Sequence, residues 1–219
     1  MGWPGGRHGA WLVIVSLGML MVSKPAPAAG LTVDRSALPS SERVRLPEYC
    51  HHTYGFDPKA DFNNPTKEAQ KFVSLMGGKI MWAMHHYCVA LVHMMRAEKL
   101  TTPKRSRDYH WSEVISEIDY VVQRAEPNFV LLPELYKNRA RALFKLGKIV
   151  EGEEMCRRAL SAKPDYWPAY IEWADALVQA GRSADARKVL EEGLQRSSDP
   201  RPIRARLAEL DRQAGVRKP

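Results

Sequence analysis

Two consecutive stretches of the chain decide its fold: residues 133–166, PELYKNRARALFKLGKIVEGEEMCRRALSAKPDY, and residues 167–200, WPAYIEWADALVQAGRSADARKVLEEGLQRSSDP. They align over 34 residues without a gap. Small residues recur at equal repeat positions: Ala140 with Ala174, Gly147 with Gly181, and Ala159 with Gly193. A fixed period of this length, with apolar residues at helical spacing, indicates a helix–turn–helix unit whose copies stack on one another.

The small residues have a physical explanation in such a stack. Ala140 and Ala174 are expected where the two helices of one repeat cross, facing Gly152 and Ala186 on the second helix. The glycines at repeat position 15 end the first helices, because a residue with left-handed backbone closes a helix at low cost. The small residues at position 27 allow the following repeat to pack closely. Pro164 stops the second helix.

Residues 133–200 resemble the tetratricopeptide-repeat (TPR) family, and the junction KPDYWPAY, residues 163–170, is typical of that family. The resemblance implies an all-α right-handed superhelix of helix–turn–helix units. The segments LPEYC (46–50) and MHHYC (84–88) are similar to a set of exported bacterial TPR proteins. The two full repeats are residues 133–166 and 167–200.

Repeats need neighbours to bury their faces, so both flanks are predicted to add helices. Residues 201–219 are expected to form a capping helix and a basic tail. Residues 78–132 are expected to form a degenerate TPR-like pair, with helices over 78–98 and 110–125 and a basic loop over 100–107. Residues 30–77 are predicted to be mostly irregular, with a short helix that begins at Asn64-Pro65 and runs to Met76.

The N-terminus carries the three parts of a secretory signal. Arg7 precedes an apolar run of 13 residues, Ala10–Val22, and a small-residue stretch follows it at residues 26–30. We therefore expect residues 1–29 to be a signal peptide and the mature protein to be periplasmic or secreted, with no membrane insertion after cleavage. An uncleaved anchor is the alternative, although the run is short for a membrane span.

The charge of the chain favours a protein partner. Removal of residues 1–29 takes away Arg7 and Lys24 and no acidic residue, so the formal net charge falls from +8 to +6. The cations alternate with acids along the predicted helices and form no dense patch with interleaved aromatic residues, which argues against nucleic-acid binding. An acidic or extended segment of another protein is the expected partner.

Three cysteines leave one unpaired residue in an oxidising compartment. Cys156 falls at an inward position of a repeat helix and is predicted to be a buried hydrophobe, which leaves Cys50 with Cys88 for a disulfide. An alternative reading is a metal-handling exported protein that binds copper or zinc through His85, His86, Cys50 and Cys88. The chain has no CxxC and no HxxxH spacing, so the disulfide is the simpler reading and no cofactor is expected.

Motifs for catalysis are absent from the sequence. It contains no glycine-rich phosphate loop, no GxSxG and no HExxH. We therefore expect a binding protein and not an enzyme.

The resemblance places the binding surface on the concave side, at positions 2, 5, 6, 9, 12 and 13 of each first helix. These positions include Glu134 in the first full repeat, and Pro168, Glu172, Val178 and Gln179 in the second. Seven of them are predicted to contact a partner: Lys137, Asn138, Arg141, Phe144, Lys145, Ile171 and Asp175. Two cations and an amide beside an aromatic residue suit an acidic segment. Glu172 stands where chaperone-binding TPR domains use an asparagine to hold a terminal carboxylate, which argues against that particular clamp.

Overall fold

The computed structural model describes residues 1–2, 33–61 and 63–216, so most of the predicted signal peptide lies outside the described residues. The regular elements of the described part are all helices. They are, in chain order, α1 (Ser40–Arg43), the 3-10 helix η1 (Glu48–His52), α2 (Lys67–Met76), α3 (Gly78–Ala97), α4 (Lys104–Val122), α5 (Leu132–Lys145), α6 (Ile149–Ala162), α7 (Trp167–Gln179), α8 (Ser183–Arg196) and α9 (Arg201–Val216).

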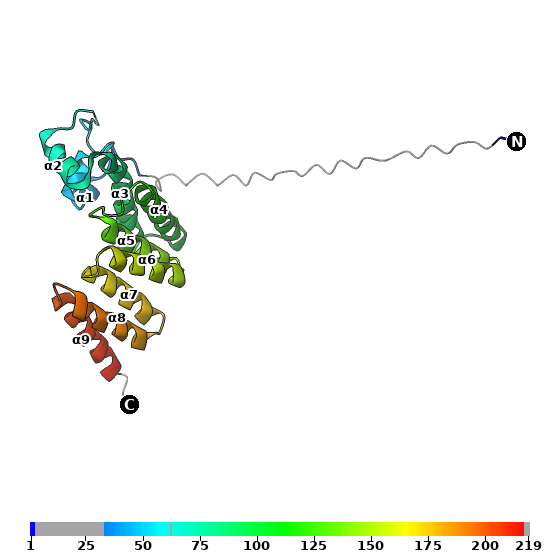
Figure 1. Ribbon diagram of the computed structural model, residues 1–219, viewed down its shortest axis with the longest axis vertical. Helices are drawn as coiled ribbons and strands as arrows, with labels where there is room; N and C mark the ends of the chain where they lie inside the picture. The colour runs from blue at the N-terminus through cyan, green and yellow to red at the C-terminus, as the bar shows by residue number, and fades with distance from the viewer. Residues whose placement is uncertain (3–32, 62, 217–219) are drawn as a thin grey trace.

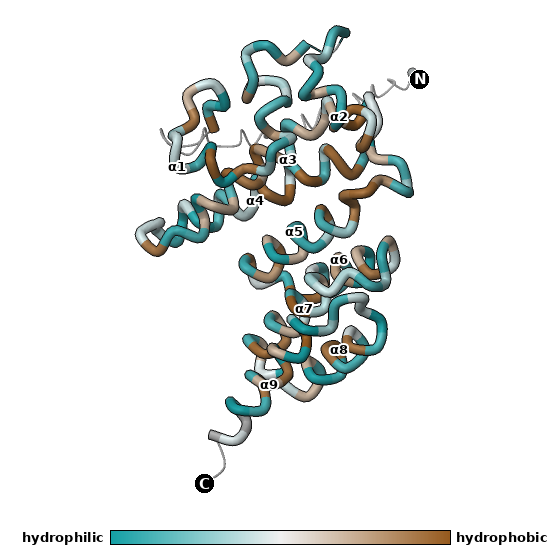
Figure 2. Tube along the Cα trace, turned by 90° about the vertical axis from the view of Figure 1, so that its left-hand side faces the viewer, coloured by the Kyte–Doolittle hydropathy of each residue, from teal (hydrophilic) through white to brown (hydrophobic). Residues whose placement is uncertain are grey.

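From α3 onward the helices follow one another as stacked pairs, α3 with α4, α5 with α6 and α7 with α8, and α9 covers the end of the stack (Figure 1). The short helices α1 and α2 lie beside α3 at the other end. This is the all-α architecture of a TPR-type superhelix, as predicted. Apolar residues concentrate where helices face each other, and the outward surfaces are mainly polar (Figure 2).

The first helix of each full repeat ends at a glycine, as the sequence predicts. Gly147 has a φ of 77° and Gly181 a φ of 76°. Beyond these glycines, the backbone N–H of Lys148 donates to the carbonyl of Leu143 over 2.9 Å, and the N–H of Arg182 donates to that of Leu177 over 2.8 Å. The left-handed residue thus turns the chain while satisfying carbonyl groups that the helix end leaves free.

Two other glycines are required by close packing. A Cβ atom at Gly193 would lie 2.6 Å from the Tyr170 ring and 3.0 Å from Ile203 of α9, so this position admits α9 at close range, as expected. A Cβ atom at Gly152 would clash with the Phe144 ring. Gly152 is therefore faced by the Phe144 ring of its own repeat.

Ala174 offers a test of the repeat register. Its side chain is fully buried in a cluster with Ala186 and Leu190 of α8. Ala174→Leu is expected to lower the free energy of unfolding by about 1–3 kcal/mol, because a larger side chain at this crossing must displace its neighbours. Urea unfolding monitored by helicity measures the change. Ala205→Leu, on the exposed face of α9, is the matched control, and equal stability of the two variants would contradict the register.

The N-terminal part differs from the prediction at two helix starts. The helix α2 begins after Thr66, whose side-chain oxygen accepts a hydrogen bond from the N–H of Ala69 over 3.2 Å, so the cap is Thr66 and not Asn64. The helix α4 begins at Lys104, directly after Pro103, so residues 104–107 are helical although a loop was predicted. Leu100 in the remaining turn is 99% exposed.

The N-terminal segment is attached to the stack by a disulfide. Cys50 of η1 and Cys88 of α3 are joined, with their Cα atoms 5.7 Å apart, and both residues are fully buried. Cys156 is a buried free cysteine within α6, and burial raises the pKa of its thiol. Glu42 of α1 adds a buried ion pair to Arg96 of α3 over 3.0 Å. Together these links hold irregular chain against α3.

Candidate functional site

The side chains predicted to bind a partner lie along the first helices α5 and α7, and the structure engages most of them in contacts between helices. Asn138 is 3% exposed. Its Nδ2 donates to the hydroxyl of Tyr87 on α3 over 2.5 Å, and its Oδ1 accepts from Lys137 Nζ over 2.5 Å. The Tyr87 hydroxyl donates onward to Glu134 over 2.6 Å. This network joins α3 to α5, so Asn138 has a structural position and is not a surface residue.

Lys137 and Arg141 are also less accessible than predicted. Lys137 is half-buried, and loss of water around its ammonium group lowers its pKa. The Arg141 guanidinium pairs with Glu172 of α7 over 2.7 Å and with Glu98, which follows α3, over 3.4 Å. Neither cation is therefore free for a partner, because Arg141 pairs with residues of two neighbouring helical units and Lys137 donates to Asn138.

Three more predicted residues pack or pair within the stack. The Phe144 ring lies against Gly152 of α6 and so faces the interior of its repeat. Ile171 is partly buried against the cluster of α7, α8 and α9. Asp175 accepts a hydrogen bond from Arg206 of α9 over 2.5 Å. The Asp175–Arg206 pair extends the row of charge pairs to α9.

Lys145 is the predicted residue that remains exposed, and it borders a depression of about 370 Å³. The depression lies between the end of α3, the start of α4 and the end of α5. Its lining includes Glu98, Lys104, Arg107 and Asp108. The basic character of residues 104–107 is visible in the sequence. Their proximity to Lys145 was not predicted, because these residues were assigned to a loop and not to the start of α4.

Among the described residues, both acidic side chains around this depression form ion pairs, whereas two of its basic side chains do not. Lys104 pairs with Asp108 over 2.5 Å, and Glu98 forms an ion pair with Arg141. Within the part of the chain that the structure describes, Arg107 and Lys145 have no ion pair, and both side chains are exposed. The two free cations lie beside the row of first helices.

The residues of the metal alternative are arranged differently from a metal site. The disulfide removes both thiolates of Cys50 and Cys88. His85 Nδ1 donates to the carbonyl of Trp82 over 2.5 Å, and His86 Nδ1 lies 2.5 Å from Glu117 Oε2. Among the described residues, no group of three or more His, Cys, Asp or Glu side chains could hold a metal ion. Nothing in this geometry supports metal handling.

Burial shifts the pKa of several groups in this region. It lowers the pKa of His85 to about 4 and raises that of Glu117 to about 6. The His86 ring stacks on Tyr120 with centroids 3.7 Å apart, and the Arg124 guanidinium lies 3.5 Å from the Tyr120 centroid. The cluster packs α3 against α4 through the stacked rings of His86 and Tyr120.

Comparison with known proteins agrees with this architecture. A family model described as tetratricopeptide repeat matches residues 143–210, from the end of α5 into α9. The match supports the assignment of this part of the chain to the tetratricopeptide-repeat family. No curated protein and no solved structure matches it. TPR domains typically bind other proteins, so the repeats suggest an interaction scaffold. In the described part of the chain, no helix is both long and apolar enough to cross a membrane.

Proposed function

We propose that this TPR protein is an exported, non-catalytic scaffold that binds an acidic segment of a partner protein along the row of first helices α3, α5, α7 and α9. The observation that carries the proposal is the pair of free cations, Arg107 and Lys145, at the depression between α3, α4 and α5. Carboxylates of a partner would find there two unpaired positive charges and a surface hollow.

The position of this site differs from the one that the sequence suggested. Arg141 pairs with Glu172 of α7 and with Glu98 after α3, and the half-buried Lys137 donates to Asn138, so charge reversal at these residues would disturb the stack itself. Lys145 follows Arg141 by one helical turn and is exposed, so its charge reaches solvent. The proposed site therefore lies one turn beyond Arg141, the last residue of α5 whose charge pairs with a neighbouring helix.

Export is the second part of the proposal. Its support is the apolar run Ala10–Val22 with the small residues after it, and the disulfide between Cys50 and Cys88, because disulfides persist in oxidising compartments. A mature N-terminus near Gly30, determined by sequencing of the protein from the periplasm or the medium, tests it. A mature chain that starts at Met1 would contradict signal cleavage.

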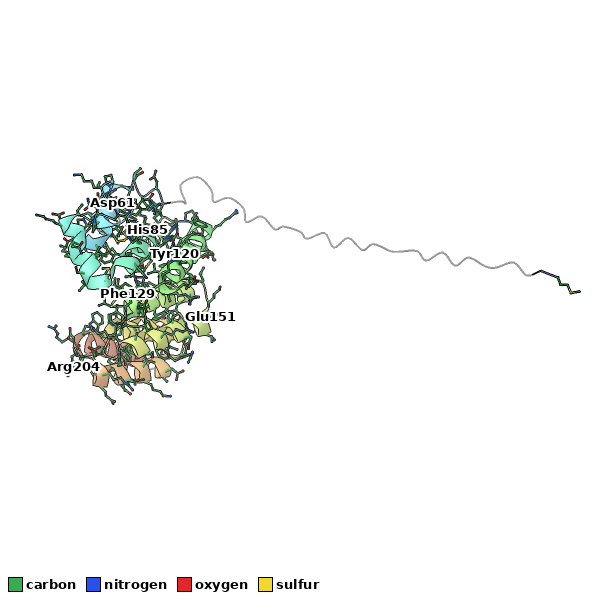
Figure 3. The ribbon with its side chains drawn as sticks, turned by 45° about the horizontal axis from the view of Figure 1, so that its top comes forward. Asp61, His85, Tyr120, Phe129, Glu151 and Arg204 are labelled. Atoms are coloured by element: carbon green, nitrogen blue, oxygen red, sulfur yellow. A yellow bond between two sulfur atoms is a disulfide. The ribbon has the colours of Figure 1, made fainter. Side chains whose placement is uncertain are left out.

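Site-specific crosslinking tests the binding surface. A photoreactive amino acid at position 145 is expected to crosslink to an acidic segment of one partner protein in the native host. The same amino acid at Glu151, an exposed residue of α6 labelled in Figure 3, is the control and is expected to give no such product. Equal products at both positions, or a product at 151 alone, would contradict a site at the depression.

Charge reversal measures how much the two cations contribute to partner binding. Arg107→Glu with Lys145→Glu is expected to weaken binding of the crosslinked partner by about tenfold or more, since two attractive contacts become repulsive. The wild-type affinity should fall with added salt, because exposed charges are screened over about 8–10 Å at ordinary ionic strength. Titration calorimetry measures both. An unchanged affinity in the double variant, with unchanged helicity, would remove the acidic-segment proposal.

A further inference from the structure

A second recess lies at the opposite end of α3, in the N-terminal part of the molecule. It is a pocket of about 240 Å³ between the turn at residues 52–61, the inner face of α2 and the first turns of α3. Asp61 borders the pocket and, together with His85, lies at the end of the molecule far from Arg204 (Figure 3). The TPR match begins at residue 143, so this pocket lies outside it.

Contacts within the protein hold the wall of the pocket in place. Thr53 is 2% exposed and Phe56 is 3% exposed, so both anchor the turn from inside. The N–H groups of Phe56 and Asp57 each donate to the carbonyl of Thr53 over 3.1 Å. The Cys50–Cys88 disulfide joins the start of this turn to α3. A wall held in this way loses little conformational entropy when a ligand binds.

The inside of the pocket is apolar and aromatic. Val73 of α2 and Met81 of α3 contribute aliphatic surface. The rings of Tyr54 and Trp82 lie with centroids 6.2 Å apart, and His52 also borders the pocket. Aliphatic stems pack well on such surfaces, and cations are attracted to the faces of aromatic rings.

Two carboxylates border the same space. Asp57 Oδ1 accepts a hydrogen bond from the N–H of Lys59 over 2.8 Å, and Asp61 Oδ1 accepts one from the N–H of Asn63 over 2.9 Å. Each carboxylate thus keeps its second oxygen for another donor. Lys79 is the one cation among the lining residues that the structure describes, and its side chain is exposed. With histidine neutral, the lining carries one excess negative charge.

We propose that this pocket binds a cationic group on an unbranched aliphatic stem, the chemistry of a lysine or arginine side chain or of a free polyamine. The stem would lie against Val73, Met81 and Trp82, and the cationic head would reach the carboxylates of Asp57 and Asp61. A volume of about 240 Å³ suits one long side chain and is smaller than the pockets of about 300–1,000 Å³ that hold drug-sized ligands. This site is independent of the proposed partner site at Lys145.

The experiment uses the full mature chain and two cationic probes. Binding of Nα-acetyl-lysine N-methylamide and of putrescine is followed through the indole NMR signal of Trp82, assigned with Trp82→Phe. Saturable shifts with either probe are expected. A response to the lysine amide alone indicates a side chain of a partner, and a response to putrescine alone indicates a free polyamine. Nα-acetyl-norleucine N-methylamide is the neutral control and is expected to bind at least tenfold more weakly.

Variants separate the charge contribution from the apolar one. Asp57→Asn with Asp61→Asn is expected to weaken probe binding about tenfold at low salt, whereas Lys79→Met is expected to strengthen it about threefold. Val73→Trp fills the pocket and should abolish binding. Glu68→Gln, on the exposed side of α2, is the control for a remote loss of charge. Equal affinity for the norleucine amide, no binding of either cation, or an unchanged affinity in the folded Asp57/Asp61 variant would overturn the proposal.

Discussion

Replacement of Cys50 and Cys88 by alanine is expected to lower the free energy of unfolding by about 2–5 kcal/mol. The disulfide links η1 to α3 across 38 residues of sequence. The described chain before α2 contains one helix of 4 residues and one 3-10 helix of 5, so little regular structure replaces the link. Alanine is preferred to serine because both cysteines are fully buried, and a buried hydroxyl would add its own penalty.

Urea unfolding of the oxidised wild type, the reduced wild type and the double variant measures this contribution. Cys156→Ala is the matched control, because it removes a buried sulfur and leaves the disulfide in place.

Thiol labelling counts the free cysteines directly. Only Cys156 should react, and only after denaturation, since its side chain is fully buried. Two or more thiols labelled in the native, unreduced protein would contradict the disulfide.

Acidification from pH 7.5 to 4.5 is expected to lower the free energy of unfolding by about 2–4 kcal/mol, in large part through the buried pair His93 and His110 and with a further contribution from His85. Each of these side chains is 3% exposed, and their Nδ1 atoms lie 2.8 Å apart. One Nδ1 must donate and the other accept, so a proton on both nitrogens would destroy the contact. Burial lowers the pKa of His93 to about 3 and lowers that of His110 as well.

The direction in which stability changes with pH follows from these pKa shifts. A histidine whose pKa is lowered by folding takes up its proton first in the unfolded chain, so stability is complete above about pH 6.5 and declines as the pH falls toward 3. The charges of Arg96 and Glu42 act on the pair in opposite directions. Glu117 opposes the trend, because its raised pKa of about 6 makes the folded state take up a proton first between pH 6 and 4.5. The pair and His85, whose pKa is lowered to about 4, together outweigh this one carboxyl group.

A pair of asparagines tests the assignment. Asparagine places an amide near the position of Nδ1, so His93→Asn with His110→Asn keeps a donor and an acceptor and removes the titration. The loss of stability between pH 7.5 and 4.5 should fall by at least half in this variant. His51→Asn, outside the pair, should leave it unchanged. A pH dependence equal to that of the wild type in the asparagine variant would assign the effect to other groups.

The repeat period alone was sufficient to predict the helical stack. The glycines that end α5 and α7 and the buried Ala140 and Ala174 are local or periodic features, so they are visible in one sequence. Periodicity also indicates on which face of a helix a residue lies. The count of cysteines and the inward position of Cys156 favoured the pairing of Cys50 with Cys88, which the structure contains.

Only the tertiary structure decided which charges are free. Arg141 meets Glu98, 43 residues away, and Asn138 meets Tyr87, 51 residues away. Such partners depend on how the divergent helices α3 and α4 pack on the repeats, and no period in the sequence encodes that contact. The N-terminal pocket arises in the same way, from η1, α2 and α3 brought together by a disulfide. The sequence therefore determined the stack of helices, whereas long-range packing determined which of its side chains can meet a partner.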